Sequence, residues 1–103
     1  MSLVIIGGNE CMERDYAELC SRYDCKVKVF TKMNRRLQSF GNPDLMILFT
    51  NAVSHKMIQC ALRSAKKTDI PVVRSHTSSK NALKNILETY TASDMRKNMN
   101  NSQ

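Results

Sequence analysis

The chain lacks the patterns that mark membrane, secreted and fibrous proteins. None of its apolar runs approaches the roughly 20 residues that span a bilayer. The apolar amino terminus, residues 3–6, has neither the basic flank nor the long apolar core of a signal peptide, and it is typical of a first strand. Only three of the 103 residues are glycine and 42% are apolar, as in an ordinary globular domain. We therefore expect one cytoplasmic domain that does not associate with membranes.

Metal-site spacings are also missing. The four cysteines are Cys11, Cys20, Cys25 and Cys60. None forms a Cys-x-x-Cys pair, and the interval from Cys20 to Cys25 matches no zinc knuckle. Small reduced cysteines in a reducing cytosol are the simplest interpretation. The two histidines could share a metal only with Glu10 or Cys11, and no spacing supports this, so the sequence predicts no metal site and indicates no particular cofactor.

Acidic residues are few, nine against sixteen Lys and Arg, which gives a formal net charge of +7. Positive charge concentrates at Lys26, Lys28, Lys32, Arg35 and Arg36. Such a chain attracts anions. Aromatic residues that could stack on bases are scarce near these cations, and no RNA-binding signature is present. We expect an anionic partner and do not favour a nucleic acid, although a basic interaction domain remains an alternative.

Strand and helix patterns alternate along the chain. Apolar runs predict strands at residues 3–6, 45–49 and 72–74, and valines alternating with lysines predict a strand at 25–31. Apolar residues at helical spacing predict helices at 12–23, 55–67 and 80–90, and residues 33–39 could form a short helix. Residues 91–103 are polar and unpatterned. We expect them to form a disordered tail after a domain that spans residues 1–90.

This order of elements predicts an α/β fold, a three-layer α/β/α sandwich with a four-stranded parallel sheet, Rossmann-like or flavodoxin-like. The run 45–49 is the most apolar and belongs at the centre of the sheet, whereas Lys26 and Lys28 give the second strand the charged face of an edge strand. The predicted strand order is therefore 2-1-3-4. The loops after the first, third and fourth strands then lie at the carboxyl edge, where ligands bind. A homodimer through the helices remains possible.

Each of these three loops carries residues suited to binding an anion. Gly7-Gly8-Asn9-Glu10 could bring backbone amides close to a ligand, but it lacks the third glycine of a dinucleotide fingerprint and the lysine of a P-loop. The segment Arg74-Ser75-His76-Thr77-Ser78-Ser79 combines a guanidinium with hydroxyls at a helix start, which can hold phosphate or carboxylate. One of Ser78 and Ser79 is also expected to cap that helix.

The loops predict a module that binds an anionic small molecule, such as a nucleotide or another phosphate compound. The predicted ligand-binding residues are Gly8, Asn9, Glu10, Asn51, Ser54, His55, Arg74, Ser75, His76, Thr77, Ser78 and Ser79. The alternative is a small hydrolase or phosphotransfer enzyme that uses His55, His76 or Ser75 as base or nucleophile. A carboxylate or metal beside a histidine would favour the enzyme.

Taken together, the loop motifs resemble those of a bacterial domain family of unknown function. Gly7-Gly8, Val53-Ser54-His55 and the segment from Arg74 to Ser79 carry the resemblance, which covers about residues 2–90. It implies a bacterial cytosolic protein with no established activity. Some relatives carry a cysteine just ahead of the Val-Ser-His segment, where this chain has Asn51, so the resemblance implies no cysteine chemistry here.

Overall fold

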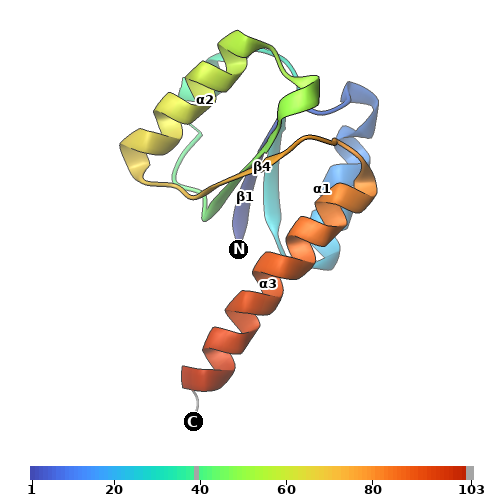
Figure 1. Cartoon of the computed structure of the whole chain (residues 1–103), viewed down its shortest axis with the longest axis vertical. Helices are drawn as coiled ribbons and strands as arrows, with labels where there is room; N and C mark the ends of the chain where they lie inside the picture. The colour runs from blue at the N-terminus through green and yellow to red at the C-terminus, as the bar shows by residue number, and fades with distance from the viewer. Residues whose placement is uncertain (39, 102–103) are drawn as a thin grey trace.

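The apolar runs of the sequence form a parallel sheet of four strands. A computed structural model describes residues 1–38 and 40–101, and the side chains of residues 1–37 and 40–91. The strands are β1 (Ser2–Ile6), β2 (Lys26–Phe30), β3 (Leu45–Phe49) and β4 (Val72–Ser75). Their order is β2-β1-β3-β4, as the sequence predicts, and Figure 1 shows the sheet with helices on both sides.

Burial explains this order. All five residues of β3 are buried, because β1 and β4 flank it and helices cover both of its faces. In β2, by contrast, Lys26 and Lys28 are exposed, Val27 and Val29 are half-buried, and only β1 pairs with the strand. The prediction that β2 is an edge strand is confirmed.

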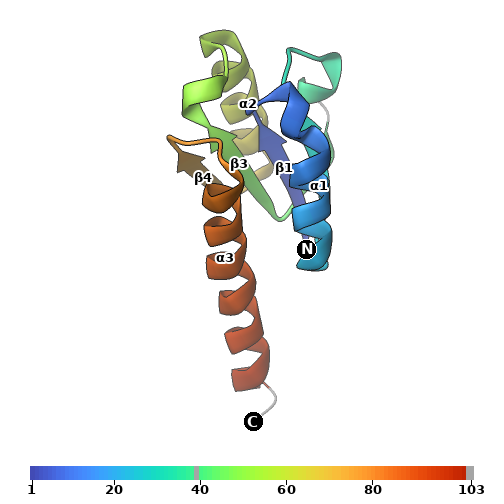
Figure 2. The same ribbon diagram turned by 90° about the vertical axis from the view of Figure 1, so that its right-hand side faces the viewer.

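In the described part of the chain, two helices and three short 3-10 turns connect the strands, and a third helix follows β4. The helices are α1 (Glu13–Arg22), α2 (His55–Thr68) and α3 (Lys80–Asn101), and the 3-10 turns are η1 (Glu10–Met12), η2 (Arg35–Gln38) and η3 (Thr50–Ala52). Figure 2 shows α3 continuing beyond the end of the sheet. The helix thus extends into the segment expected to be a tail, and the domain boundary near residue 90 stays a prediction. Within the described part of the chain, no helix is long and apolar enough to cross a membrane.

Two apolar cores hold the layers together. One lies between the sheet and the pair α1 and α3, with Ile5, Tyr16 and Leu83 at its centre. The other lies between the sheet and α2 with η2, around Ile6 and Met57. Full burial of one such aliphatic side chain contributes about 1.5–3 kcal/mol to stability. Helices must therefore cover the apolar residues on both faces of the sheet, which produces the three-layer architecture.

Candidate functional site

The loops that carry the predicted site residues lie at one edge of the sheet. All four strands run parallel, so the segments after β1, β3 and β4 lie together at the carboxyl edge. His55 begins α2 and His76 follows β4, which puts both histidines on this edge as the strand order predicts. The Thr50 hydroxyl donates a hydrogen bond to the Ser75 carbonyl at 3.3 Å and so links the two loops.

Gly7 and Gly8 let the loop after β1 pack closely against η3 and against Tyr16 of α1. Both residues have positive φ, +94° and +93°. The Gly8 amide donates to the carbonyl of Ala52 at 3.0 Å, so it is engaged within the protein. A Cβ on Gly8 would lie 2.9 Å from the ring and the hydroxyl of Tyr16. Close packing against Tyr16 therefore accounts for glycine at this position.

Tyr16 fills the space beside Gly8, which follows β1, and Phe49, the last residue of β3. The Tyr16 ring is fully buried and packs on Phe49 with ring centroids 5.5 Å apart. Its hydroxyl donates a 2.6 Å hydrogen bond to the Ser78 carbonyl and so ties α1 to the loop before α3. The space beside Gly8 and Phe49 is therefore occupied by a side chain of the protein itself.

Several of the predicted polar groups stabilise the loops themselves. Ser54 caps α2 by accepting from the Met57 amide at 3.2 Å. Ser79 caps α3 by accepting from the Ala82 amide at 3.2 Å. The Ser75 hydroxyl donates to the Thr77 carbonyl at 2.7 Å.

The other predicted site residues differ in whether their side chains already form hydrogen bonds or ion pairs within the protein. Asn9 accepts from the Cys11 amide at 2.9 Å, and Glu10 forms an exposed ion pair with Lys32 at 3.0 Å, which raises the pKa of Lys32. Asn51 is exposed. Among the described residues, no hydrogen-bond partner reaches the hydroxyls of Thr77 and Ser78. These two hydroxyls remain available to a ligand.

Arg74 and the serine-rich loop lie on different faces of the sheet. Side chains alternate between the two faces along a strand, so residues two apart share a face. Val72 packs in the core under α2, and Arg74 therefore lies on the α2 side as well. Ser75 lies on the other side, with α1 and α3. The cradle predicted from the sequence is thus divided by β4, and the part beside α3 consists of His76 to Ser79.

Both histidines lie at the surface of the carboxyl-edge loops. His55 is exposed, and its Nε2 lies 3.2 Å from the Gln59 side-chain nitrogen. His76 is exposed, and in the described region no carboxylate contacts either ring. Within the described residues, no three His, Cys, Asp or Glu side chains lie close enough together to hold a metal.

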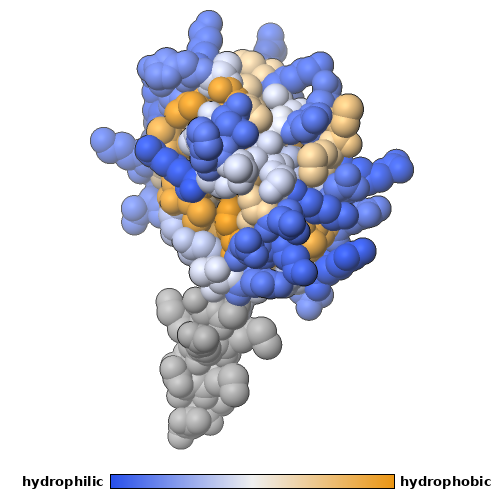
Figure 3. Space-filling view, turned by 45° about the vertical axis from the view of Figure 1, so that its right-hand side comes forward, coloured by the Kyte–Doolittle hydropathy of each residue, from blue (hydrophilic) through white to orange (hydrophobic). Residues whose placement is uncertain are grey.

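A hollow of about 460 Å³ adjoins the first turn of α3. It lies between α1 and α3 and is lined by Leu19, Arg22, Tyr23, Lys80, Asn81 and Lys84. Its three cations form no ion pair within the described residues. The Tyr23 hydroxyl donates to Glu88 at 3.0 Å, and partial burial together with this bond raises the pKa of Tyr23. Figure 3 shows one face of the molecule, on which hydrophilic side chains project around areas of apolar atoms.

The ligand-binding residues predicted from the sequence include none of the polar residues that line this hollow, which are Arg22, Tyr23, Lys80, Asn81 and Lys84. Lys80 and Lys84 are one helical turn apart, and this spacing next to a predicted phosphate loop is a usable signal. Arg22 and Tyr23 come from α1, and only the packing of α1 beside α3 brings them to the hollow.

The fold and the carboxyl-edge loops define a small doubly wound α/β domain of the Rossmann-like or flavodoxin-like class. Residues 2–90 match the model of a family described as "Uncharacterized protein conserved in bacteria (DUF2325)". The chain belongs to this family, in agreement with the resemblance of its loops. No curated protein and no solved structure shows significant similarity to the chain.

Proposed function

We propose that this domain binds a small phosphate-bearing molecule at the start of α3. The observation that carries the proposal is the hollow beside α1, where Arg22, Lys80 and Lys84 line one space without ion-pair partners among the described residues. Its volume of about 460 Å³ lies within the range of ligand pockets, roughly 300–1,000 Å³. The body of the ligand would occupy this hollow.

The first turn of α3 supports the same position for the phosphate. The helix dipole and unpaired amides at a helix start favour an anion. No acceptor in the described region bonds the amides of Lys80 and Asn81. Thr77 and Ser78 precede them in the chain, separated from Lys80 by the capping residue Ser79. We assign the phosphate to these groups, with His76 at the border of the site.

The scarcity of acidic residues around these loops also favours binding of an anion. From Thr50 to Leu87 the sequence contains a single acidic residue, Asp69, and it ends α2 at the opposite edge of the sheet. The loops after β3 and β4 therefore present cations and neutral groups to a ligand. The enzyme alternative has no comparable support, because a catalytic imidazole needs a group that orients it. We also propose a cytoplasmic location, since the cysteine spacings in the sequence match neither a disulfide framework nor a zinc site and suit a reducing compartment.

Phosphate-dependent stabilisation tests the proposal. A ligand at ten times its Kd adds about 1.4 kcal/mol to the free energy of unfolding. We expect millimolar inorganic phosphate to raise the Tm of the wild type, and the gain to disappear in Lys80→Gln/Lys84→Gln. The control is Lys66→Gln/Lys67→Gln, which removes the same charge from the far end of α2.

The comparison between the two variants separates binding from the general stabilising effect of salt. Equal gains in both double variants would contradict the proposal. Loss of the gain in Arg74→Gln, with Lys80→Gln/Lys84→Gln unaffected, would move the anion to the α2 side of β4 and would also overturn it.

A further inference from the structure

We propose that the outer edge of β2 binds an acidic, extended segment of another protein as an additional strand. This edge lies on the opposite side of the sheet from β4, at the other end of the strand order. The inference is independent of the phosphate site at α3.

The hydrogen bonds of β2 leave its outer edge unpaired. Lys26 donates its amide to Met1 at 2.9 Å, and the Phe30 carbonyl accepts from Gly7 at 2.8 Å, so both residues point their backbone groups toward β1. Alternate residues of a strand point these groups to opposite sides. The N–H and C=O of Val27 and Val29 therefore face outward, and no described residue bonds them.

The same strand carries positive charge without acidic partners. Lys26 and Lys28 project on one face, two residues apart, and both are exposed. The one ion pair found among the described residues joins Lys32 to Glu10, so neither Lys26 nor Lys28 takes part in one. A neighbouring strand with carboxylates at alternate positions would set them opposite these lysines.

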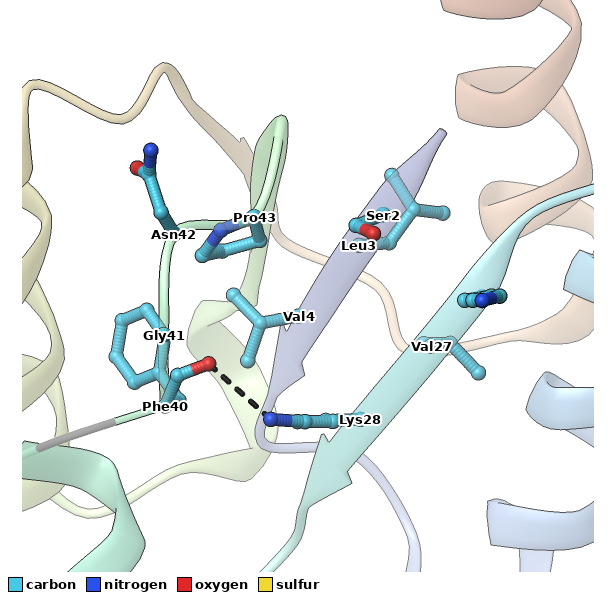
Figure 4. Close-up of a pocket in the computed structure, with 10 residues that line it drawn as sticks. Ser2, Leu3, Val4, Val27, Lys28, Phe40, Gly41, Asn42 and Pro43 are labelled. Carbon is cyan, nitrogen blue, oxygen red and sulfur yellow. Dashed lines mark hydrogen bonds between the residues drawn. The ribbon is translucent and has the colours of Figure 1, made fainter.

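Two hollows adjoin Lys28. The first, about 280 Å³, lies over Val4 between β2 and the loop of Phe40 and Pro43 (Figure 4). The second, also about 280 Å³, is lined by Lys28, Val29, Phe30, Asn34, Arg36 and Phe40. Lys28 separates them and donates from Nζ to the Phe40 carbonyl at 3.3 Å.

The lysines of β2 and the burial of the nearby aromatic rings favour an acidic peptide over a second copy of the chain or a nucleic acid. A second copy pairing through β2 would oppose lysines with lysines, which is unfavourable. A single-stranded nucleic acid needs exposed rings for its bases, but Phe30 and Phe40 expose only 6% and 5% of their surface. An acidic strand satisfies both the open backbone groups and the lysines, which corresponds to recognition by strand addition.

The probe is a blocked eight-residue peptide of alternating Glu and Thr, and hydrogen exchange followed by NMR is the main readout. We expect the peptide to slow exchange of the Val27 and Val29 amides. The Lys26 and Lys28 amides, which already face β1, should change little. Protection of Val72 and Arg74, at the other edge of the sheet, with Val27 and Val29 unchanged would overturn the proposal.

Substitutions test charge and backbone separately in a fluorescence anisotropy titration of the labelled peptide. Lys26→Gln/Lys28→Gln should weaken binding about three- to tenfold, while Lys66→Gln/Lys67→Gln should leave it unchanged. Val27→Pro removes an outward N–H that β1 does not use, so the sheet is preserved and binding should be lost.

Two further arms can refute the proposal. Equal affinity for a peptide with Gln in place of Glu would exclude recognition of charge. Binding of an oligouridylate at this edge, with no peptide-dependent protection of Val27 and Val29, would identify a nucleic-acid surface instead.

Discussion

Removal of the Tyr16 hydroxyl should loosen the contact between α1 and the loop before α3. Tyr16→Phe keeps the ring that packs on Phe49 and deletes only the donor of the 2.6 Å bond to the Ser78 carbonyl. Loss of a hydrogen bond whose acceptor stays partly buried costs about 1–2 kcal/mol. For a domain of this size we expect the Tm to fall by roughly 5–10 °C.

The matched control is Tyr23→Phe, which deletes an exposed hydroxyl bonded to Glu88 at 3.0 Å. Surface substitutions of this kind change the free energy of unfolding by less than about 0.5 kcal/mol. Urea unfolding of both variants, monitored by circular dichroism, measures the two changes at constant m-value. Equal losses in the two variants, or no loss in Tyr16→Phe, would refute the role assigned to the buried hydroxyl.

Three other outcomes follow from the structure. Gly8→Ala should lower the free energy of unfolding by about 2–4 kcal/mol, because φ is +93° and the new Cβ would lie 2.9 Å from Tyr16. Gly41 also has positive φ, but the space around it is open, so Gly41→Ala should lower it by only about 1 kcal/mol in the same assay. Burial raises the pKa of the Cys20 thiol from 9.0 to about 12. Between these pH values the thiol is protonated in the folded protein and ionised in the unfolded chain. The free energy of unfolding should therefore be highest below pH 9 and fall as the pH rises toward 12. Urea unfolding between pH 8 and roughly pH 10 should then show a steeper decline for the wild type than for Cys20→Ala. Thiol titration without reductant should count four thiols in the denatured chain and find exposed Cys11 the first to react in the native one, and a count of two would reveal a disulfide.

Much of the fold could be predicted because its strands differ in how they are buried. The continuous apolar run of β3 predicts a strand covered on both faces, and the structure buries all five residues. The lysines of β2 predict an edge strand, and β2 is one. These two positions, with parallel connections, determine the order of all four strands.

The details of the site could not be predicted because they depend on contacts between distant segments. Gly7-Gly8 indicates a close backbone approach, but the sequence cannot tell whether a ligand or Tyr16 approaches. Tyr16 is expected in an apolar stripe, and nothing local indicates that its hydroxyl reaches Ser78. The cluster of Arg22 with Lys80 and Lys84 likewise arises only when α1 and α3 pack side by side.

An NMR titration of the labelled chain with inorganic phosphate and with adenosine monophosphate tests the central claim most directly. Saturable shifts of the Ser78, Lys80 and Asn81 amides are predicted, and the nucleotide should also shift resonances of Arg22 and Tyr23 across the hollow. Shifts that do not saturate, or that map to β2 or to the start of α2 while the α3 amides stay unchanged, would contradict phosphate binding at this site.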